Sequence, residues 1–382
     1  MRWIKLMIII TVLSLVACNN QKQDQAQFAE DSQLELEDKQ VESGPELYEI
    51  TLAAIGDILI HDRVYDDART DQGFDFMPMI ERVAPYLTAA DVVTANQETM
   101  IGGEEYGLSG YPSFNSPKEV GDMLKEVGVD LVNLANNHTL DRGEEVVYSA
   151  LDYWDELGVE YVGSYRSFSD RDRIRTVEKN NIGLAFLGYS YGTNGIPIPD
   201  GKEYLINLID REQISHDVQL AKQHADVVVM HLHFGDEYVR MPNEQQKELA
   251  QFVADLGVDV ILGHHPHVLQ PIEWLEREDG QETLVIYSLG NFLSGQDQLY
   301  RQIGGILELT IKKEVDQEGS TTEITSPRFL PTYVTFAENP PHQFRMIPMH
   351  ELTDQQLEAA RYHYEEIKEH MSQWLPELDF IN

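Results

Sequence analysis

From residue 50 onward, short apolar runs alternate with amphipathic stretches along the chain. Short apolar runs bounded by turn-forming residues predict buried strands, and their alternation with helix-length stretches is typical of a βαβ architecture. The predicted strands cover residues 50–55, 91–95, 129–134, 160–162, 182–188, 227–232, 258–262 and 284–288. With 382 residues to build a core, the pattern predicts a layered α/β domain.

Two of the amphipathic stretches show the i, i+3, i+4, i+7 spacing of a helix with one buried face. In residues 143–157 this apolar stripe consists of Val146, Val147, Ala150, Leu151 and Trp154. In residues 243–255 it consists of Leu249, Phe252 and Val253. Gly158 and Gly257 follow these stretches, where a left-handed residue commonly ends a helix.

Polar residues fall directly after the predicted strands. In open α/β sheets, ligands bind beyond the carboxyl ends of the strands, so these residues predict one shared site. The six strand ends read Gly56-Asp57, Asn96-Gln97-Glu98-Thr99, Asn136-Asn137-His138 with Asp141 three residues on, His231-Leu232-His233-Phe234-Gly235, Gly263-His264-His265-Pro266-His267 and Ser288-Leu289-Gly290-Asn291-Phe292.

The densest of these strand ends holds three histidines within four residues, from His264 to His267. Gly263 lets the backbone turn and Pro266 stiffens the loop, so that His265 and His267 can converge on one point. Neutral imidazole is the commonest metal ligand near neutral pH. The alternative is a surface loop that is rich in histidine by coincidence.

The available ligand types narrow the predicted metal. Cys18 is the only cysteine in the chain, which argues against structural zinc and iron–sulfur clusters. Carboxylate, amide and imidazole ligands suit Mn²⁺, Zn²⁺, Fe or Mg²⁺, and the candidates suffice for two divalent ions. Paired ions can activate water and clamp the oxygens of a displacement, with Asp57 or Glu98 as the bridging carboxylate. His138, beside the ligand candidate Asn137, is the candidate catalytic acid, and Asp141 is a second candidate catalytic residue.

The strand-end motifs resemble the CapA family of capsule-synthesis, poly-γ-glutamate biosynthesis proteins. The resemblance rests on six motifs in order between about residues 48 and 309: Gly56-Asp57, Asn96-Gln97-Glu98-Thr99, Ala135–Gly143, His233–Tyr238, Gly263–Val268 and Tyr287–Phe292. That family is similar in fold to calcineurin-like metallophosphoesterases, which implies a layered α/β/β/α sandwich with a dimetal site.

Carried over motif by motif, the resemblance implies roles for individual residues. The implied metal ligands are Asp57, Glu98, Asn137, His233, His265 and His267, with His138 as the acid. Ser288 and Asn291 would shape the last loop or contact substrate. The chain departs from the phosphoesterase pattern in two places: Glu98 replaces a shorter Asp, and the first motif lacks its histidine. Whether His61 takes the place of that histidine is left open.

Some of these residues also have simpler explanations. Asp57 could cap the turn after its strand, and Asn136, Asn137 and Asp141 could form a capping loop before a helix. On an extended strand His231 points away from His233, so His231 is expected to be a buried, hydrogen-bonded core residue. The same argument applies to His264 beside His265.

The amino terminus predicts export. Basic residues and an apolar run in residues 1–17 are typical of a signal peptide. The sequence Leu15-Val16-Ala17-Cys18 resembles a bacterial lipobox, which implies lipid attachment at Cys18. The polar composition of residues 18–47 predicts a flexible tether. The protein is therefore expected on the outer face of the cytoplasmic membrane, held by a lipid anchor.

The remaining predicted organisation is a CapA-like domain over residues 48–310, with C-terminal strands and a helix in residues 311–382 packing on it. The formal charge is 28 − 66 = −38, which argues against nucleic acid as a partner. Two functions fit. One is a surface-anchored metal-dependent hydrolase that acts on a phosphoester or another polarised bond. The other is a non-catalytic component of a membrane synthase or export complex that binds an anionic polymer such as poly-γ-glutamate.

Overall fold

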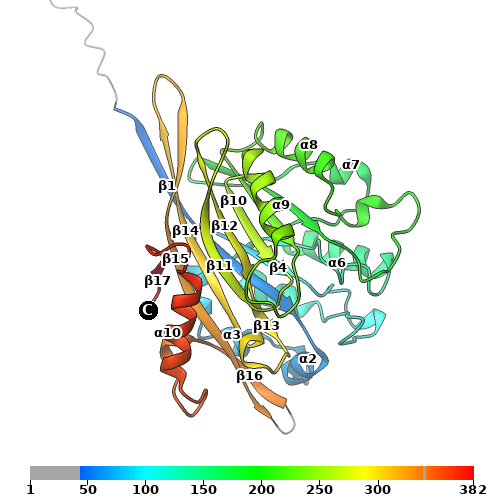
Figure 1. Cartoon of the computed structure of the whole chain (residues 1–382). Helices are drawn as coiled ribbons and strands as arrows, with labels where there is room; N and C mark the ends of the chain where they lie inside the picture. Colours follow the sequence, from blue (N-terminus) through cyan, green and yellow to red (C-terminus); the bar gives the residue numbers. More distant parts are fainter. Residues whose placement is uncertain (1–43, 339–340) are drawn as a thin grey trace, which may run out of the picture. The chain divides into compact units, whose positions relative to one another are not determined.

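The computed structural model describes residues 44–338 and 341–382 (Figure 1). The predicted signal peptide, Cys18 and most of the predicted tether lie outside these residues; the first strand already begins at Glu46. Pro45–Asn382 form one compact unit. Within the described residues, no helix has the length and apolar character needed to cross a membrane.

The first sheet is built around β1, which is buried on both faces. Its parallel part runs from β1 through β4 and β5 to β6, whereas β14, β15 and β16 continue it in antiparallel pairing on the other side of β1. Two short strands, β13 and β17, pair with β1 and β15. The strands are β1 (Glu46–Leu59), β4 (Val92–Gln97), β5 (Val129–Asn133), β6 (Glu160–Val162), β13 (Asn291–Ser294), β14 (Ile303–Val315), β15 (Ser320–Glu338), β16 (Pro341–Pro348) and β17 (Asp379–Phe380).

The second sheet has six strands in the order β11-β12-β10-β9-β8-β7. Its four central strands are parallel, and its two edge strands, β11 and β7, are antiparallel to their neighbours. The strands are β7 (Arg175–Lys179), β8 (Ile182–Ser190), β9 (Val227–His233), β10 (Val260–His264), β11 (Leu269–Glu276) and β12 (Glu282–Leu289). A separate hairpin pairs β2 (Arg69–Thr70) with β3 (Gly73–Phe74).

The two sheets and the helices beside them form layers (Figure 1), and three apolar clusters lie between these layers. Successive side chains of β1 point to opposite faces, so Leu52 and Ala54 join the cluster between the sheets, whereas Ala53 and Ile55 join the cluster beneath the helices. The helices on the first sheet are α2 (Asp62–Ala68), α3 (Met77–Ile80), α4 (Ala84–Thr88), α5 (Glu119–Glu126) and α6 (Glu144–Leu157). Helices α8 (Arg211–Ala221) and α9 (Glu244–Asp255) cover the second sheet. The predicted α/β/β/α arrangement is confirmed.

All eight predicted strands and both predicted helices are present, with ends that differ by a few residues. The sequence pattern missed most of the antiparallel half of the first sheet. There β14 runs from Ile303 to Val315 and pairs with β1 along ten residues. Helix α7 (Phe168–Arg171) is a single turn, and α10 (Ala360–Met371) packs on β11 and β15.

Candidate metal centre

The first sheet contributes oxygen ligands to one rim of the sandwich. Asp57 lies within β1 and is aligned with Asn96 of β4 and Asn291 of β13. The chain approaches closely here, since a Cβ on Gly56 would lie 2.0 Å from Gly290 O. Glu98 follows β4 directly. Because Asp57 lies inside a strand, it does not cap a turn, as the simpler explanation had supposed.

The second sheet contributes imidazoles to the same rim. His233 is the last residue of β9, and His265 and His267 lie just beyond β10. Both of these loop histidines have left-handed backbones, with φ values of 96° and 57°. Such a conformation is costly for a residue with a Cβ, and this strain is concentrated where the two rings are brought to one point.

The ligand atoms of these residues form two buried trios that share one carboxylate. Asp57, Glu98 and His267 form the first trio, and Glu98, His233 and His265 form the second. Within each trio the ligand atoms lie within 4.8 Å of one another. Asn137 adjoins the second trio, because His233 Nε2 lies 2.7 Å from Asn137 Oδ1. All six predicted ligands therefore lie together, with Glu98 between the two groups.

Several buried polar atoms in the centre have no hydrogen-bond partner among the described residues. They are both carboxylate oxygens of Glu98 and the Nδ1 atoms of His233, His264 and His265. An unsatisfied buried polar atom costs about 1–3 kcal/mol, so a cluster of them requires an explanation. Divalent cations fit this set of oxygen and imidazole donors.

Burial and neighbouring charges change the pKa values of the acidic residues in opposite directions. Burial raises the pKa of Glu98 well above its usual range, and the charge of Asp57 adds to this effect. Burial would also raise the pKa of Asp57, but the neighbouring imidazoles of His264 and His267, of which His267 is hydrogen-bonded to it, outweigh this effect and lower the pKa. Asp57 is thus firmly ionised, whereas Glu98 favours its protonated form until a cation balances its charge.

His267 lies between these two carboxylates. Its Nδ1 donates to Asp57 Oδ2 at 3.0 Å, and its Nε2 lies 3.7 Å from Glu98 Oε1. Burial lowers the pKa of His267, but the charges of Glu98 and Asp57 and the hydrogen bond to Asp57 raise it to about 9. A cation bound here would replace that proton.

The predicted catalytic pair, His138 and Asp141, lies beside the centre. His138 Nδ1 is 2.8 Å from Asp141 Oδ2, and the backbone N–H of Phe114 donates to the same oxygen at 2.8 Å. The two residues line a cleft of about 300 Å³ that also includes Asn137, Asn194 and Glu237. The proposed capping loop is not observed, since Gly143 is the N-cap of α6 and the helix has no side-chain cap.

Ser288 and Asn291 are fully buried and contact protein backbone. Ser288 Oγ accepts from Gly290 N at 3.2 Å. Asn291 Nδ2 donates to the carbonyls of Arg301 at 2.8 Å and His267 at 3.4 Å. Of the two roles predicted for Ser288 and Asn291, these contacts fit the shaping of the loops around His267.

His61 belongs to none of the cation-binding groups in the described part of the chain. Its Nδ1 lies 3.0 Å from Leu59 O and 3.2 Å from Gly295 N, so backbone groups occupy that nitrogen. His231 is fully buried, as expected, with Nε2 2.9 Å from Thr94 Oγ and Nδ1 2.9 Å from His264 Nε2.

The sequence reasoning missed two contributors to the centre. Glu237 forms a third, partly exposed trio with His265 and His267. His264 Nδ1 lies 3.6 Å from Asp57 Oδ1, so this histidine connects the buried His231 to the centre. Glu237 lies in the motif His233–Tyr238, and its position four residues after His233 could have identified it as a candidate ligand.

The fold and the rim define a class: a layered α/β/β/α protein with a buried carboxylate–imidazole centre at the ends of its strands. Comparison with known proteins gives the family. The model of the family "Bacterial capsule synthesis protein PGA_cap" matches residues 51–296, and the chain belongs to this family.

Named relatives agree with this assignment. The PGA biosynthesis protein CapA of Bacillus subtilis (strain 168) is 29% identical over 277 residues, which cover 69% of this chain and 68% of that protein. The capsule biosynthesis protein CapA of Bacillus anthracis is 29% identical over 297 residues, covering 72% and 70%. A crystal structure of a hypothetical protein from Thermus thermophilus covers 74% of this chain and 99% of that chain, with a TM-score of 0.40 and 17% identity.

Proposed function

We propose that this chain acts in capsule or poly-γ-glutamate biosynthesis through a dimetal, hydrolase-type centre. The observation that carries this proposal is the sharing of Glu98 by two buried trios. A carboxylate has two oxygens, and those of Glu98 have no hydrogen-bond partner among the described residues. One such residue can therefore bridge two cations, as dimetal hydrolases require.

Asp57, Glu98 and His267 would hold one ion, and Glu98, Asn137, His233 and His265 the other. Bound divalent ions would supply Lewis acidity and an ionised water at neutral pH. Enclosure of the ligands in a buried rim keeps bulk water from competing for them.

His138 is the proposed acid. Asp141 accepts a hydrogen bond from Nδ1, which leaves the other ring nitrogen, Nε2, to deliver a proton to a leaving oxygen. The hydrogen bond from Phe114 N holds Asp141 in place, and the edge of the Phe114 ring packs against His138 at 4.8 Å between centroids. These contacts fix the imidazole orientation before substrate arrives.

The test combines metal analysis with turnover. We expect the full-length chain to bind two divalent ions per molecule and to hydrolyse at least one member of a panel of phosphoesters and γ-glutamyl polymers. Turnover should disappear with a chelator and return with Mn²⁺ or Zn²⁺. A fully metallated protein that is inactive on the whole panel would exclude the hydrolase.

The second candidate is a non-catalytic component that binds the polymer. With a formal charge of −38, the protein needs bound cations to hold an acidic polymer, and this candidate shares that requirement with the first. The same centre would then bind polymer carboxylates through its ions without turnover, within a membrane synthase or export complex. Metal-dependent polymer binding in the inactive protein would establish this function.

We also propose that Cys18 carries a lipid that holds the domain at the outer face of the cytoplasmic membrane. Support comes from the sequence of residues 1–18. Replacement of the cysteine by Cys18→Ser should prevent labelling by a radioactive fatty acid and release the protein from the membrane fraction. Equal labelling of the two proteins would contradict the anchor.

A further inference from the structure

Two exposed tyrosines lie on opposite sides of the candidate metal centre. Tyr191 contacts His265, with ring centroids 4.6 Å apart, and Tyr238 lies 6.0 Å from His267. The two histidine rings are 5.9 Å apart. The rings therefore follow one another across the rim in the order Tyr191, His265, His267, Tyr238. With 48% and 39% of their surfaces exposed, the tyrosines border any ligand that reaches the centre.

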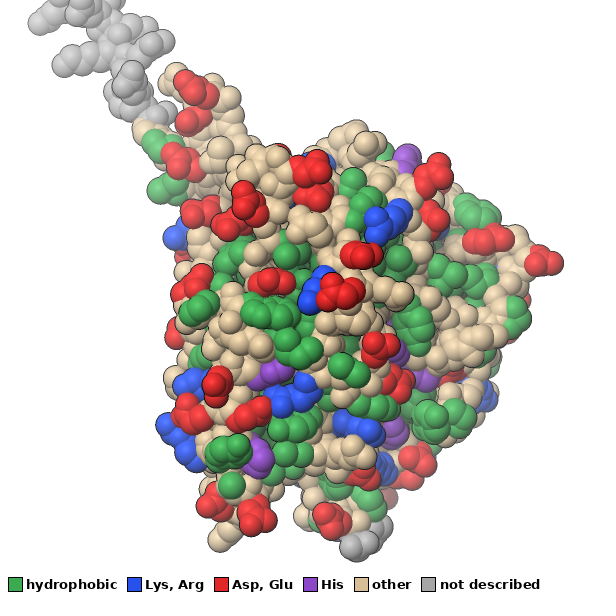
Figure 2. Space-filling model, viewed as in Figure 1, with side chains coloured by type: hydrophobic (Ala, Val, Ile, Leu, Met, Phe, Trp, Pro, Cys, Tyr) green, Lys and Arg blue, Asp and Glu red, His purple; other side chains and the backbone are tan. Residues whose placement is uncertain are grey.

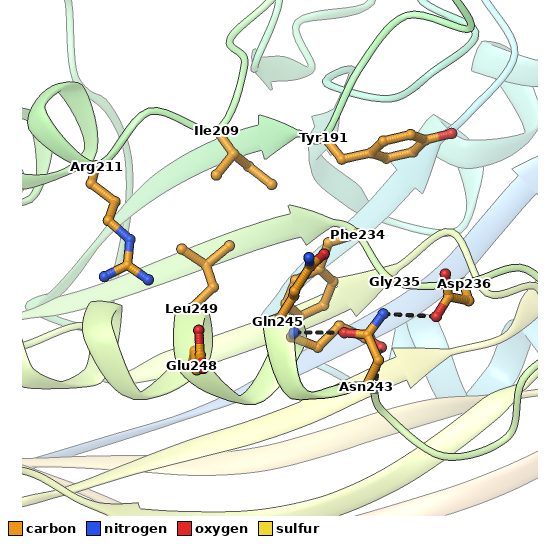
Figure 3. A pocket seen from close by; sticks show the side chains of 11 residues that line it. Tyr191, Ile209, Arg211, Phe234, Gly235, Asp236, Asn243, Gln245, Glu248 and Leu249 are labelled. Carbon is orange, nitrogen blue, oxygen red and sulfur yellow. Dashed lines mark hydrogen bonds between the residues drawn. The ribbon is translucent and has the colours of Figure 1, made fainter.

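A cleft of about 530 Å³ opens beyond Tyr191 (Figure 3). Phe234 and Leu249 supply apolar surface, and Gln245 is an exposed amide at the start of α9. Arg211 and Asp236 line opposite ends of the cleft (Figure 3). Asp236 lies three residues after the predicted ligand His233. The guanidinium of Arg211 lies over the ring of Phe252, 4.6 Å from its centroid.

Arg301 occupies the corresponding place beyond Tyr238. Its guanidinium lies 3.4 Å from the centroid of the Tyr238 ring. The Arg301 carbonyl accepts from Asn291 Nδ2, and Asn291 Nδ2 also contacts the His267 carbonyl. Each end of the row of rings is therefore followed by an arginine that lies over an aromatic ring.

These two arginines are unusual in so acidic a protein. Carboxylates are spread over the face in Figure 2, and most arginines have one as a partner. In residues 44–338 and 341–382, the arginines without an ion pair are Arg142, Arg211, Arg301 and Arg345. Arg142 and Arg345 donate to neighbouring carbonyls. Within those residues the structure shows only stacking contacts for the guanidiniums of Arg211, which is exposed, and Arg301, which is partly exposed, so their donors remain available to a ligand.

We propose that Arg211 and Arg301 bind carboxylates of one extended γ-linked polyglutamate strand that crosses the metal centre between Tyr191 and Tyr238. This inference rests on the proposed function and specifies how its substrate is held. Guanidinium forks match carboxylates, and an aromatic ring beneath each fork fixes its direction. The apolar surface of Phe234 and Leu249 suits the methylene groups of the strand, and the free amide of Gln245 suits its peptide links.

The acidic residues along this path limit where carboxylates can lie. Asp236 and Glu248 line the cleft, and Glu237 adjoins the centre. These groups repel a polymer carboxylate, so binding is favourable only where an arginine or a bound cation balances the charge. The arrangement selects the register of the polymer as well as its charge.

The experiment measures binding of a purified γ-linked oligoglutamate to the metal-loaded, full-length protein by calorimetry. We expect Arg211→Gln and Arg301→Gln each to weaken binding about five-fold, and the double variant about 25-fold. Arg345→Gln is the matched control, since Arg345 also lacks an ion pair among the described residues but lies away from the centre; its affinity should stay within two-fold of wild type.

Two further measurements separate this inference from the function on which it rests. Metal content of the arginine variants should equal that of the wild type, whereas Glu98→Gln should lose metal. The same oligomer with its carboxylates amidated should bind no better to the wild type than to the double variant. Unchanged oligoglutamate affinity in the double variant, or no binding by the metal-loaded wild type, would overturn the proposal. Loss of binding with retained metal in Glu98→Gln would instead overturn the dimetal centre.

Discussion

The two sheets contribute different chemistry to the same rim. The first sheet supplies oxygen atoms, from Asp57, Glu98 and Asn137, and the second supplies nitrogen atoms, from His233, His265 and His267. Oxygen ligands are hard, and those of Asp57 and Glu98 are charged when ionised, whereas imidazoles must be neutral to bind. Each of the two buried trios takes its carboxylate and imidazole ligands from both sheets, whereas the partly exposed trio of Glu237, His265 and His267 follows strands of the second sheet alone. A cation bound in either buried trio would therefore connect the two sheets.

The two contributions also differ in how the backbone holds them. Asp57 lies in a regular strand and Glu98 directly follows one. His265 and His267 instead lie on a loop with left-handed backbones. The comparison indicates that the oxygen side is preformed by strand pairing, while the nitrogen side stores strain that ligand binding can offset.

The largest expected effect comes from Glu98→Gln, which removes the one carboxylate shared by both trios. Loss of residues that only support a metal ligand costs about 10–100-fold in metal affinity or activity, so loss of the bridging ligand should cost more than about 100-fold. Elemental analysis should show fewer than two ions per chain. Glu126→Gln replaces an exposed carboxylate of α5 that belongs to none of the cation-binding groups in the described residues, and it serves as the matched control, with both ions retained.

The next effect concerns His138, which neither trio includes. His138→Ala should lower any hydrolytic rate by about 10²- to 10⁴-fold and leave two ions bound, because a general acid contributes to turnover and not to ligation. Rate and metal content are measured on the same preparation. An equal loss of metal would make His138 a ligand or a structural residue.

Metal removal tests whether both sheets depend on the ions. Ions at 100 times their dissociation constant would stabilise the fold by about 2.7 kcal/mol, so a chelator should lower the midpoint of thermal unfolding. Hydrogen exchange should then increase at amides on both sides of the rim, including Asp57 N and Tyr238 N. Faster exchange on one sheet alone would mean that the bound ions contact ligands of that sheet only.

The smallest effect is the pH dependence of the metal-free protein. The pKa of His267 is raised to about 9 from about 6.5 in the unfolded chain, so its stabilising contribution is complete below pH 6.5. That contribution is lost as the pH rises through 9. The raised pKa of Glu98 acts in the same direction. Denaturant titrations of wild type and His267→Gln should show a flatter profile above pH 6.5 in the variant.

Much of this rim was predictable because strand ends are marked in the sequence. Apolar runs located the parallel strands, and the polar residues after them lie together because parallel strands end at the same edge. Glu237 was missed because its position depends on the turn after β9, whose backbone angles the sequence does not define. His264 is the last residue of β10, and strand alternation alone does not show that its ring approaches Asp57 of the other sheet. Strand β14, the antiparallel partner of β1, was also missed. It consists of residues 303–315, far from β1 along the chain, and its pairing depends on long-range packing.

The most direct test of the centre is anomalous diffraction from crystals of the protein grown with Mn²⁺. The account predicts two anomalous peaks at the rim, one contacted by Asp57 and His267 and the other by His233 and His265, with Glu98 contacting both. A single peak, or two peaks that do not share Glu98, would contradict it.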